Sequence, residues 1–337
     1  YVAFEDGMRG LIPHTPAYVL EKRYGDCKDM ASLIVGLLKA VGIKGYYTWI
    51  GTRDIPFQYS ALPSPLVDNH MIAVYKDING VFYFLDATSN HTALSMPSSM
   101  IQGKEAFVCL GADQYLVKKV PQLSGSKSMK VDTVKLTVAG STLKGEGRAY
   151  FTGYQKVFAS YAFNKTDEKT QRQNAEAWTY KGSNKYVLNE YAISNVDNKD
   201  KPLRLDYTFT IADYLTYVDD ELFVNLNLEK LFYNKLIPES RKAPRERDYN
   251  LADESVQQLQ IPAGYQVEYL PPEIYFSNDF ISFSIRYAQT ASTITAYTRV
   301  EVNDLLLMPA QVAEWNQAIK NLSNAYKESI ILKKIAP

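Results

Sequence analysis

The chain has 337 residues, enough for two domains, with 46% hydrophobic and 22% charged residues, as is ordinary for a soluble globular protein. Its 37 basic residues balance 37 acidic ones, so no net charge attracts nucleic acid or an anionic membrane. No apolar run approaches the ~20 residues that span a bilayer, and two cysteines cannot build a disulfide framework. We therefore expect no nucleic-acid partner and no transmembrane segment.

The first residues, YVAFEDGMRG, contain no initiator Met, no basic region and no apolar region of a signal peptide. They begin in the middle of a pattern, so we expect further sequence upstream. The 26 tyrosines, together with many Asn and Thr, favour a β-rich protein and an extracytoplasmic location, in the periplasm or at the cell surface.

Two helices are predicted at the start of the chain. Thr15 and Pro16 provide an N-cap and a first helical residue for TPAYVLEKRY, which we expect to end at Gly25. Asp26 caps a second helix, in which Asp29 favours the exposed N–H groups of the first turn. Spacings of three and four residues predict one buried stripe on this helix, made of Met30, Leu33, Ile34, Leu37, Leu38 and Val41. Gly42 is its stop residue.

Strand-like segments follow at 45–51 (GYYTWIG), 70–76 (HMIAVYK) and 81–88 (VFYFLDAT). A proline-containing loop separates the first two. The apolar segment EAFVCLG predicts a further strand with Cys109 in its core.

The polar segment 122–130, QLSGSKSMK, is the expected boundary between domains 1–121 and 129–337. Beyond it, strand patterns dominate, with a hairpin at 131–153, a helical stretch near 154–178 and a terminal amphipathic helix from Pro309. The predicted fold class is α+β, in which the second domain is a mostly antiparallel β-sandwich with helical additions and a C-terminal helix.

Cys27 lies in RYGDCKD, at the first turn of the second predicted helix. Unpaired N–H groups and the helix dipole favour a thiolate there, whereas Asp26 and Asp29 oppose it. A nucleophilic thiol also needs a base, and the base needs an orienting partner.

Of the three histidines, His70 opens an alternating strand that turns at DING and returns toward Asp86. With the turn centred between Ile78 and Asn79, His70 falls opposite Asp86 or one residue from it, on one face of adjacent strands. The pairing predicts a histidine oriented by a carboxylate. A backbone-satisfied strand histidine and a turn-capping Asp86 are the alternative interpretations.

Three motifs, RYGDCKDMA at 23–31, NHMIAV at 69–74 and FLDAT at 84–88, occur in an order that resembles the transglutaminase-like superfamily of cysteine enzymes. GDCKD is similar to a bacterial branch in which this core lies between β-rich domains. IPAGYQVEYLP and the terminal helix resemble its C-terminal partner. The resemblance implies a papain-like core with Cys27 as nucleophile, His70 as general base and acid, and Asp86 as orienter.

The resemblance also implies acyl transfer through a thioester, on an amide bond of a protein or peptide. Hydrolysis by a peptidase or amidase and crosslinking by a transglutaminase both remain open, with hydrolysis favoured. The oxyanion would bind the Cys27 backbone N–H, with Trp49 or Tyr24 as second donor. The competing hypothesis is a catalytically silent cell-envelope binding or assembly module.

We expect no cofactor and no metal site, because no Cys/His pair has ligand spacing. Glycine-rich GSTLKGEG, from Gly140, is interpreted as a hairpin turn. Aromatic segments of the second domain could contact glycan or peptide, although sheet packing explains them more simply.

Overall fold

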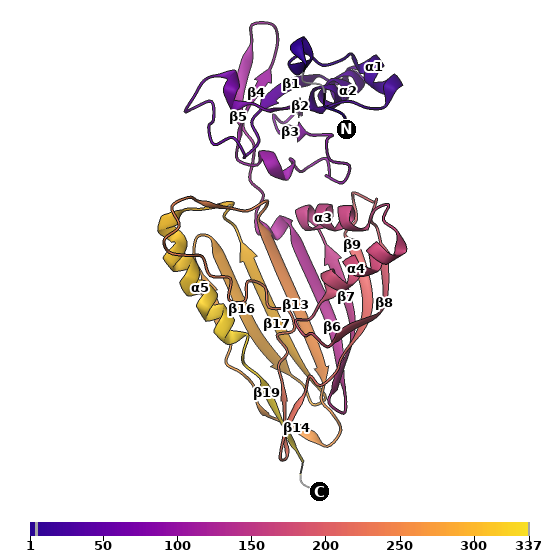
Figure 1. Cartoon of the computed structure of the whole chain (residues 1–337), viewed down its shortest axis with the longest axis vertical. Coiled ribbons are helices and arrows are strands. Elements are labelled where there is room, and N and C mark those ends of the chain that lie inside the picture. Colours follow the sequence, from indigo (N-terminus) through magenta and orange to yellow (C-terminus); the bar gives the residue numbers. More distant parts are fainter. Residues whose placement is uncertain (4–5, 336–337) are drawn as a thin grey trace. The chain divides into compact units, whose positions relative to one another are not determined.

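The computed structural model describes residues 1–3 and 6–335. The chain divides into two compact units, Tyr1–Leu123 (unit 1) and Ser124–Pro337 (unit 2), and this division falls inside the polar segment 122–130. Both units combine helices with sheets, strands predominate, and a helix lies near the C-terminus (Figure 1). In the part of the chain that the structure describes, no helix is both long and apolar enough to cross a membrane.

Unit 1 is built on a five-stranded antiparallel sheet with the order β3-β2-β1-β4-β5. Its strands are β1 (Gly45–Ile50), β2 (His70–Lys76), β3 (Phe82–Leu85), β4 (Glu105–Cys109) and β5 (Tyr115–Lys119). Alternation divides their side chains between two faces. One face carries the core of the unit, which includes Ile50, Ile72, Val74, Ala106 and Val108. The other face packs Met71 and Trp49 against Cys27.

Two helices precede the sheet, α1 (Pro16–Lys22) and α2 (Cys27–Ala40). The expected end of α1 at Gly25 is wrong, because the left-handed residue is Arg23, with φ 59°. Gly25 serves close packing instead, since a Cβ there would meet the Asp29 side chain at 2.5 Å. Gly42, with φ 77°, follows α2 as predicted.

The predicted buried stripe of α2 is wrong at its C-terminal end. Leu37 is 53% exposed and Val41 71% exposed, whereas Ala31 near the start of the helix is 1% exposed. The first turns of α2 pack on the sheet through the buried residues Cys27 and Ala31. Burial is therefore concentrated where the candidate nucleophile lies.

Unit 2 is built on an eight-stranded sheet with the order β15-β16-β17-β13-β6-β7-β9-β8. Its strands are β6 (Met129–Ala139), β7 (Thr142–Phe151), β8 (Tyr186–Ser194), β9 (Leu203–Ile211), β13 (Leu251–Gln260), β15 (Ile274–Ser277), β16 (Ile281–Gln289) and β17 (Thr293–Val302). Neighbouring strands are antiparallel except for β6 and β13, which run parallel. Gly140, with φ 61°, forms the expected turn of the β6–β7 hairpin.

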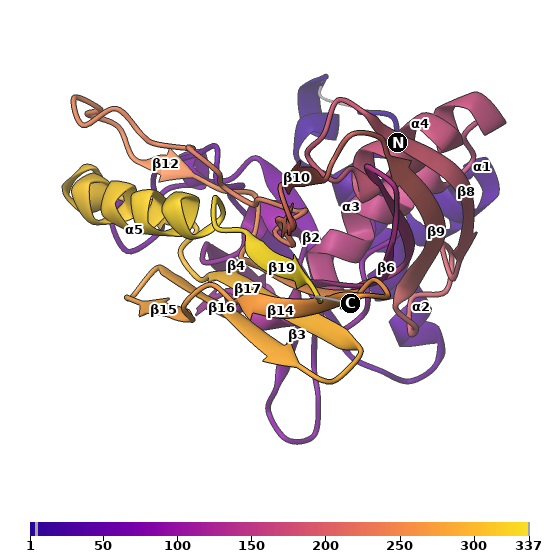
Figure 2. The same cartoon turned by 90° about the horizontal axis from the view of Figure 1, so that it is seen from below.

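A smaller sheet of β10 (Thr216–Val218), β11 (Glu221–Val224), β19 (Ile330–Lys334) and β14 (Tyr265–Tyr269) shares a hydrophobic core with the large one. The predicted helical additions pack on the large sheet. α5 (Val312–Ala325) inserts Trp315 against β16 and β17, and α3 (Gly153–Phe163) and α4 (Glu168–Thr179) contribute to the larger core. Figure 2 shows α5 near β15 and β16, away from α4 and β8. A short pair, β12 (Arg245–Glu246) and β18 (Leu306–Leu307), completes the unit.

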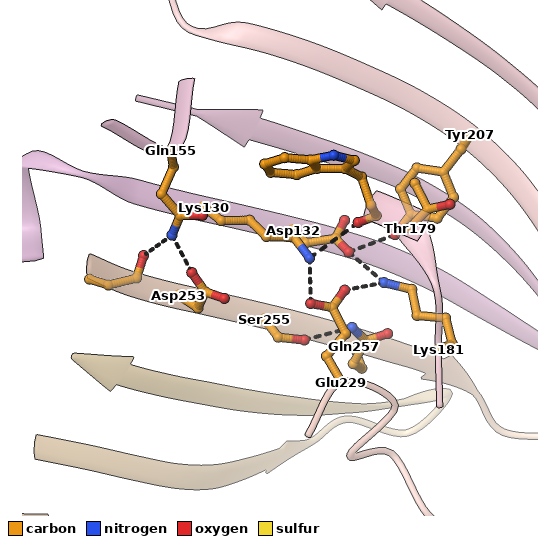
Figure 3. Close-up of polar contacts among 12 residues, drawn as sticks. Lys130, Asp132, Gln155, Thr179, Lys181, Tyr207, Glu229, Asp253, Ser255 and Gln257 are labelled. Atoms are coloured by element: carbon orange, nitrogen blue, oxygen red, sulfur yellow. Dashed lines mark hydrogen bonds and ion pairs between the residues drawn. The ribbon is translucent and has the colours of Figure 1, made fainter. Parts of the chain in front are cut away.

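A cluster of buried polar side chains joins β6 to Lys181, Tyr207 and Glu229, which lie in later segments of unit 2 (Figure 3). The Lys181 ammonium donates to Asp132 Oδ2 at 2.5 Å and also to Glu229. Lys130 Nζ donates to Glu229 Oε2 at 2.6 Å, and the Tyr207 hydroxyl donates to Asp132 Oδ2 at 2.6 Å. Each of these two acids therefore faces a lysine inside the unit.

Replacement of Lys181 by Met should destabilise unit 2 by about 3–5 kcal/mol, because it leaves the buried Asp132 and Glu229 carboxylates with one fewer cation. The measurement is urea unfolding followed by tryptophan fluorescence in a Trp49→Phe background. That background retains Trp178 and Trp315, both in unit 2, as reporters.

Lys185→Met is the matched control, since Lys185 pairs with Asp213 at 2.6 Å on the surface. Its unfolding midpoint should stay close to that of the parent. Equal effects of the two substitutions would contradict a stabilising role for the buried cluster.

Candidate active site

Cys27 is the first residue of α2, and its position is fixed by the helix cap before it. Asp26 is the N-cap as predicted, and its Oδ1 accepts hydrogen bonds from the backbone N–H of Lys28 at 2.9 Å and of Asp29 at 3.2 Å. The Asp26 carboxylate also pairs with Lys28 Nζ at 2.6 Å. The negative charge of Asp26 is thus balanced locally, which reduces its opposition to a thiolate at Cys27.

His70 and Asp86 are in contact, as expected, with His70 Nε2 3.0 Å from Asp86 Oδ2. The predicted strand register is wrong, because Ala73 pairs with Leu85 and Asp86 lies just beyond β3, diagonal to His70. The difference arises in the turn, where Asp77 Oδ1 accepts N–H groups from both Asn79 and Val81. This longer, capped turn shifts the register, and the diagonal reach between strands still joins the two side chains.

Further hydrogen bonds hold the Asp86 carboxylate in place. Its Oδ1 accepts from the Thr88 backbone N–H at 3.1 Å and the Thr88 hydroxyl at 2.6 Å. Ser98 donates its hydroxyl to Oδ2 at 2.6 Å. Sequence reasoning missed Ser98, because it lies in a loop with no periodic pattern. Thr88 was visible only as a possible turn residue of FLDAT.

The start of β2 is fastened to the end of β1. Asn69 Oδ1 accepts the Thr52 backbone N–H at 2.8 Å, and Asn69 Nδ2 donates to the Thr52 hydroxyl at 3.0 Å. In the sheet register, His70 pairs with Ile50. These contacts fix the backbone from which the imidazole projects.

The buried imidazole and carboxylate form an ion pair. Burial alone would lower the pKa of His70, but its hydrogen bonds to Asp86 and Cys27, with their charges, raise that pKa to about 9. Burial alone would raise the pKa of Asp86, but His70, Ser98 and Thr88 lower it to about 2. At neutral pH, His70 is therefore positive and Asp86 negative. Nε2 is taken by Asp86, which leaves Nδ1 for the thiol.

The pKa of Cys27 is lowered even though the residue is buried. Burial would raise this pKa, but the hydrogen bond and charge of His70 outweigh burial. The backbone N–H of Met71 also donates to the sulfur, and Lys28 adds positive charge. The three predicted residues are thus brought together as a thiol, an imidazole and a carboxylate joined in series. Their catalytic use stays a prediction.

Cys27 opens into a cleft of about 1050 Å³ within unit 1, although it is only 7% exposed. Trp49 lines this cleft, whereas Tyr24 does not and instead hydrogen-bonds to Tyr18. Of the two predicted second donors, Trp49 is thus the one that lies at the cleft.

The side chain of Tyr1 also lines the cleft beside Cys27. Its phenol hydrogen-bonds to the thiol and the backbone of Cys27, and burial together with Cys27 raises the pKa of Tyr1 to about 12. The adjacent Val2 N–H donates to the Gly25 carbonyl at 3.0 Å. An acyl group that binds at Cys27 must displace this phenol.

The other candidates have different roles. Asp29 lies in the first turn of α2 as expected and also pairs with His14, whose Nδ1 lies 3.1 Å from its carboxylate. Cys109 lies in β4 as expected but is half-buried, and burial raises its pKa, as does the negative charge of Asp68. His91 is buried. Among residues 1–3 and 6–335, no group of three His, Cys, Asp or Glu side chains is arranged to hold a metal ion.

Known proteins resemble this chain in two ways. Residues 214–332, in unit 2, match a family described as a domain of unknown function with a solved structure (DUF3858). A crystal structure of a "putative protease" from Parabacteroides distasonis is similar over 94% of this chain and 46% of its own length, with a TM-score of 0.50 and 11% identity. This chain spans less than half of that protein, and the likeness concerns the fold alone. No curated protein matches the chain.

The ionisation of Cys27 can be measured in a Cys109→Ser background, where Cys27 is the remaining cysteine. The pH dependence of iodoacetamide labelling should give a pKa below that of a free thiol. His70→Ala should raise this pKa, because burial then acts without the imidazolium. Where the pKa exceeds 7, each further unit of rise lowers the thiolate fraction at pH 7 about tenfold. Identical labelling profiles with and without His70 would exclude the ion pair.

Asp86→Asn should raise the labelling pKa of Cys27 by less than His70→Ala does. The amide keeps the shape of the side chain but lacks the charge that holds His70 protonated. The same assay measures the labelling pKa of Cys27 in this variant. Asp113→Asn, in an exposed loop, is the control for the loss of one carboxylate. If the two Asn variants behave alike, Asp86 does not orient and charge His70.

Proposed function

We propose that this chain is a thiol acyl-transfer enzyme that acts on amide bonds of proteins or peptides. The observation that carries the proposal is the hydrogen-bonded series from Cys27 through His70 to Asp86, beside a large cleft. A buried cysteine with a lowered pKa, a paired base and an orienting carboxylate are the parts that nucleophilic catalysis requires.

In the proposed reaction, the Cys27 thiolate attacks the amide carbonyl and His70 Nδ1 gives its proton to the leaving nitrogen. The C–N bond breaks, and a thioester to Cys27 remains. Water or an amine then attacks the thioester, His70 takes the proton of the attacking group, and the thiolate leaves. The backbone N–H of Cys27, at the start of α2, would stabilise the oxyanion, with Trp49 as candidate second donor.

The three motifs RYGDCKDMA, NHMIAV and FLDAT support a transglutaminase-like, papain-like core, and the fold likeness to a protein named as a protease is compatible with it. Hydrolysis is the favoured outcome and crosslinking the second. A binding module with the same core but no turnover is the competing function, which the following experiment separates.

Incubation of the Cys109→Ser protein with a p-nitrophenyl ester should release a burst of one p-nitrophenol per chain, because acylation of Cys27 precedes a slower deacylation. Intact mass should show one acyl group. The further substitutions Cys27→Ser and His70→Ala should remove the burst. Adding cadaverine, an amine, measures which fraction of the thioester reacts with the amine and which fraction reacts with water. Absence of a Cys27-dependent burst would support the binding module.

The rate of peptide-amide cleavage should follow a bell-shaped pH profile. Its acidic limb reflects the lowered pKa of Cys27, and its alkaline limb should fall near pH 9, where His70 loses the proton that the leaving nitrogen needs. A rate that still rises steadily above pH 9 would contradict His70 as the general acid.

A further inference from the structure

We propose that the cleft beside Cys27 binds a peptide through a large apolar side chain, aromatic by preference, seated on an aromatic shelf made of Trp49, Tyr59, Phe107, Tyr115 and Val117. All five residues line the same cleft as Cys27. The inference names a substrate class for the proposed function. Binding of the peptide does not depend on that function, but reaction of the bound peptide at Cys27 rests on it.

The shelf follows from the sheet register. Met71 pairs with Trp49, Trp49 pairs with Phe107, and Phe107 pairs with Val117. Directly paired residues project on the same face, so the four side chains form one row across β2, β1, β4 and β5. The row begins at Met71, which packs against Cys27, and ends at the sheet edge.

Two further rings widen the row around Phe107. Tyr115 stacks on it with a centroid distance of 4.6 Å, and Tyr59 lies on it with a centroid distance of 5.7 Å. Val117 is 42% exposed and Tyr115 is 62% exposed. An apolar ligand would therefore remove a substantial apolar area from water here.

The charges of the cleft disfavour an acidic ligand. The positive charge of Lys28 is already paired with Asp26, at 2.6 Å, so it offers little attraction to an acidic ligand. Glu105 lies two residues before Phe107 on β4, so it shares the face of the shelf, and Asp68 also lines the cleft. A carboxylate bound beside Phe107 would meet like charge.

The distances suit a peptide in an extended conformation. Strands lie ~4.8 Å apart, so Phe107 is about 10 Å and Val117 about 14 Å along the row from Met71. At ~3.3 Å per residue, this corresponds to a side chain about three to four residues from the attacked carbonyl. The cleft volume of about 1050 Å³ also exceeds the need of a single side chain.

The test is protection of Cys27 from iodoacetamide in the Cys109→Ser protein at pH 7. The probes are acetylated and amidated pentapeptides with alanine throughout except for a central Phe, Ala or Glu. A short peptide can shift along the cleft, so the assay does not depend on which side of the scissile bond contacts the shelf. The Phe peptide should half-protect at about tenfold lower concentration than the Ala peptide, and the Glu peptide should protect least.

Val117→Asp should weaken protection by the Phe peptide at least about fivefold, because it places a carboxylate on the shelf at an edge-strand position that folding tolerates. Phe107→Ala should weaken it further. Leu37→Asp, at an exposed apolar residue of α2 that does not line the cleft, is the matched control and should leave protection unchanged.

Equal protection by the Phe and Ala peptides, or equal effects of Val117→Asp and Leu37→Asp, would overturn the inference. The proposed function fails separately, through labelling that does not depend on His70. Phe-selective protection without His70 dependence would support the shelf and exclude the enzyme. His70-dependent labelling without Phe-selective protection would exclude the shelf and leave the proposed enzyme supported.

Discussion

The buried carboxylate of Asp86 is the constraint on which the candidate site depends. A carboxylate out of water is stable only if it is hydrogen-bonded and paired with a positive charge. Thr88 and Ser98 supply hydroxyl and backbone donors, and His70 supplies the charge. Because Asp86 keeps His70 protonated, the imidazolium can in turn lower the pKa of Cys27. The reactivity expected of the sulfur therefore originates two side chains away.

Unit 2 uses buried charge for a different purpose. Lys181 is 1% exposed and lies between Asp132 and Glu229, so each acid already has its cation inside the cluster. Cys27 is also largely buried, but it lines a cleft. Access to a ligand, more than burial or perturbed pKa, is what distinguishes a candidate reactive centre from a structural ion cluster here.

The sequence predicted the residues of the candidate site better than the contacts that support them. Cys27, His70 and Asp86 stood out because a thiol, an imidazole and a carboxylate are costly at such positions without partners. The register between β2 and β3 was not predictable, because one side chain, Asp77, decides how the turn closes. Asp29 was predicted in the first turn of α2, but its pairing with His14 was not, because His14 lies in a segment without periodic pattern.

For the fold, alternation and turn residues located most strands, but not how the layers cover one another. Strand β19 was not predicted, because IILKK is too short to have a distinctive period. The parallel pairing of β6 with β13, which matches Met129 with Ala252, has a consequence for synthesis. As the chain emerges, β6 and its hairpin partner are complete long before residues 251–260 exist. One edge of β6 must wait unpaired during that interval, so unit 2 is most vulnerable to aggregation while it is still being translated.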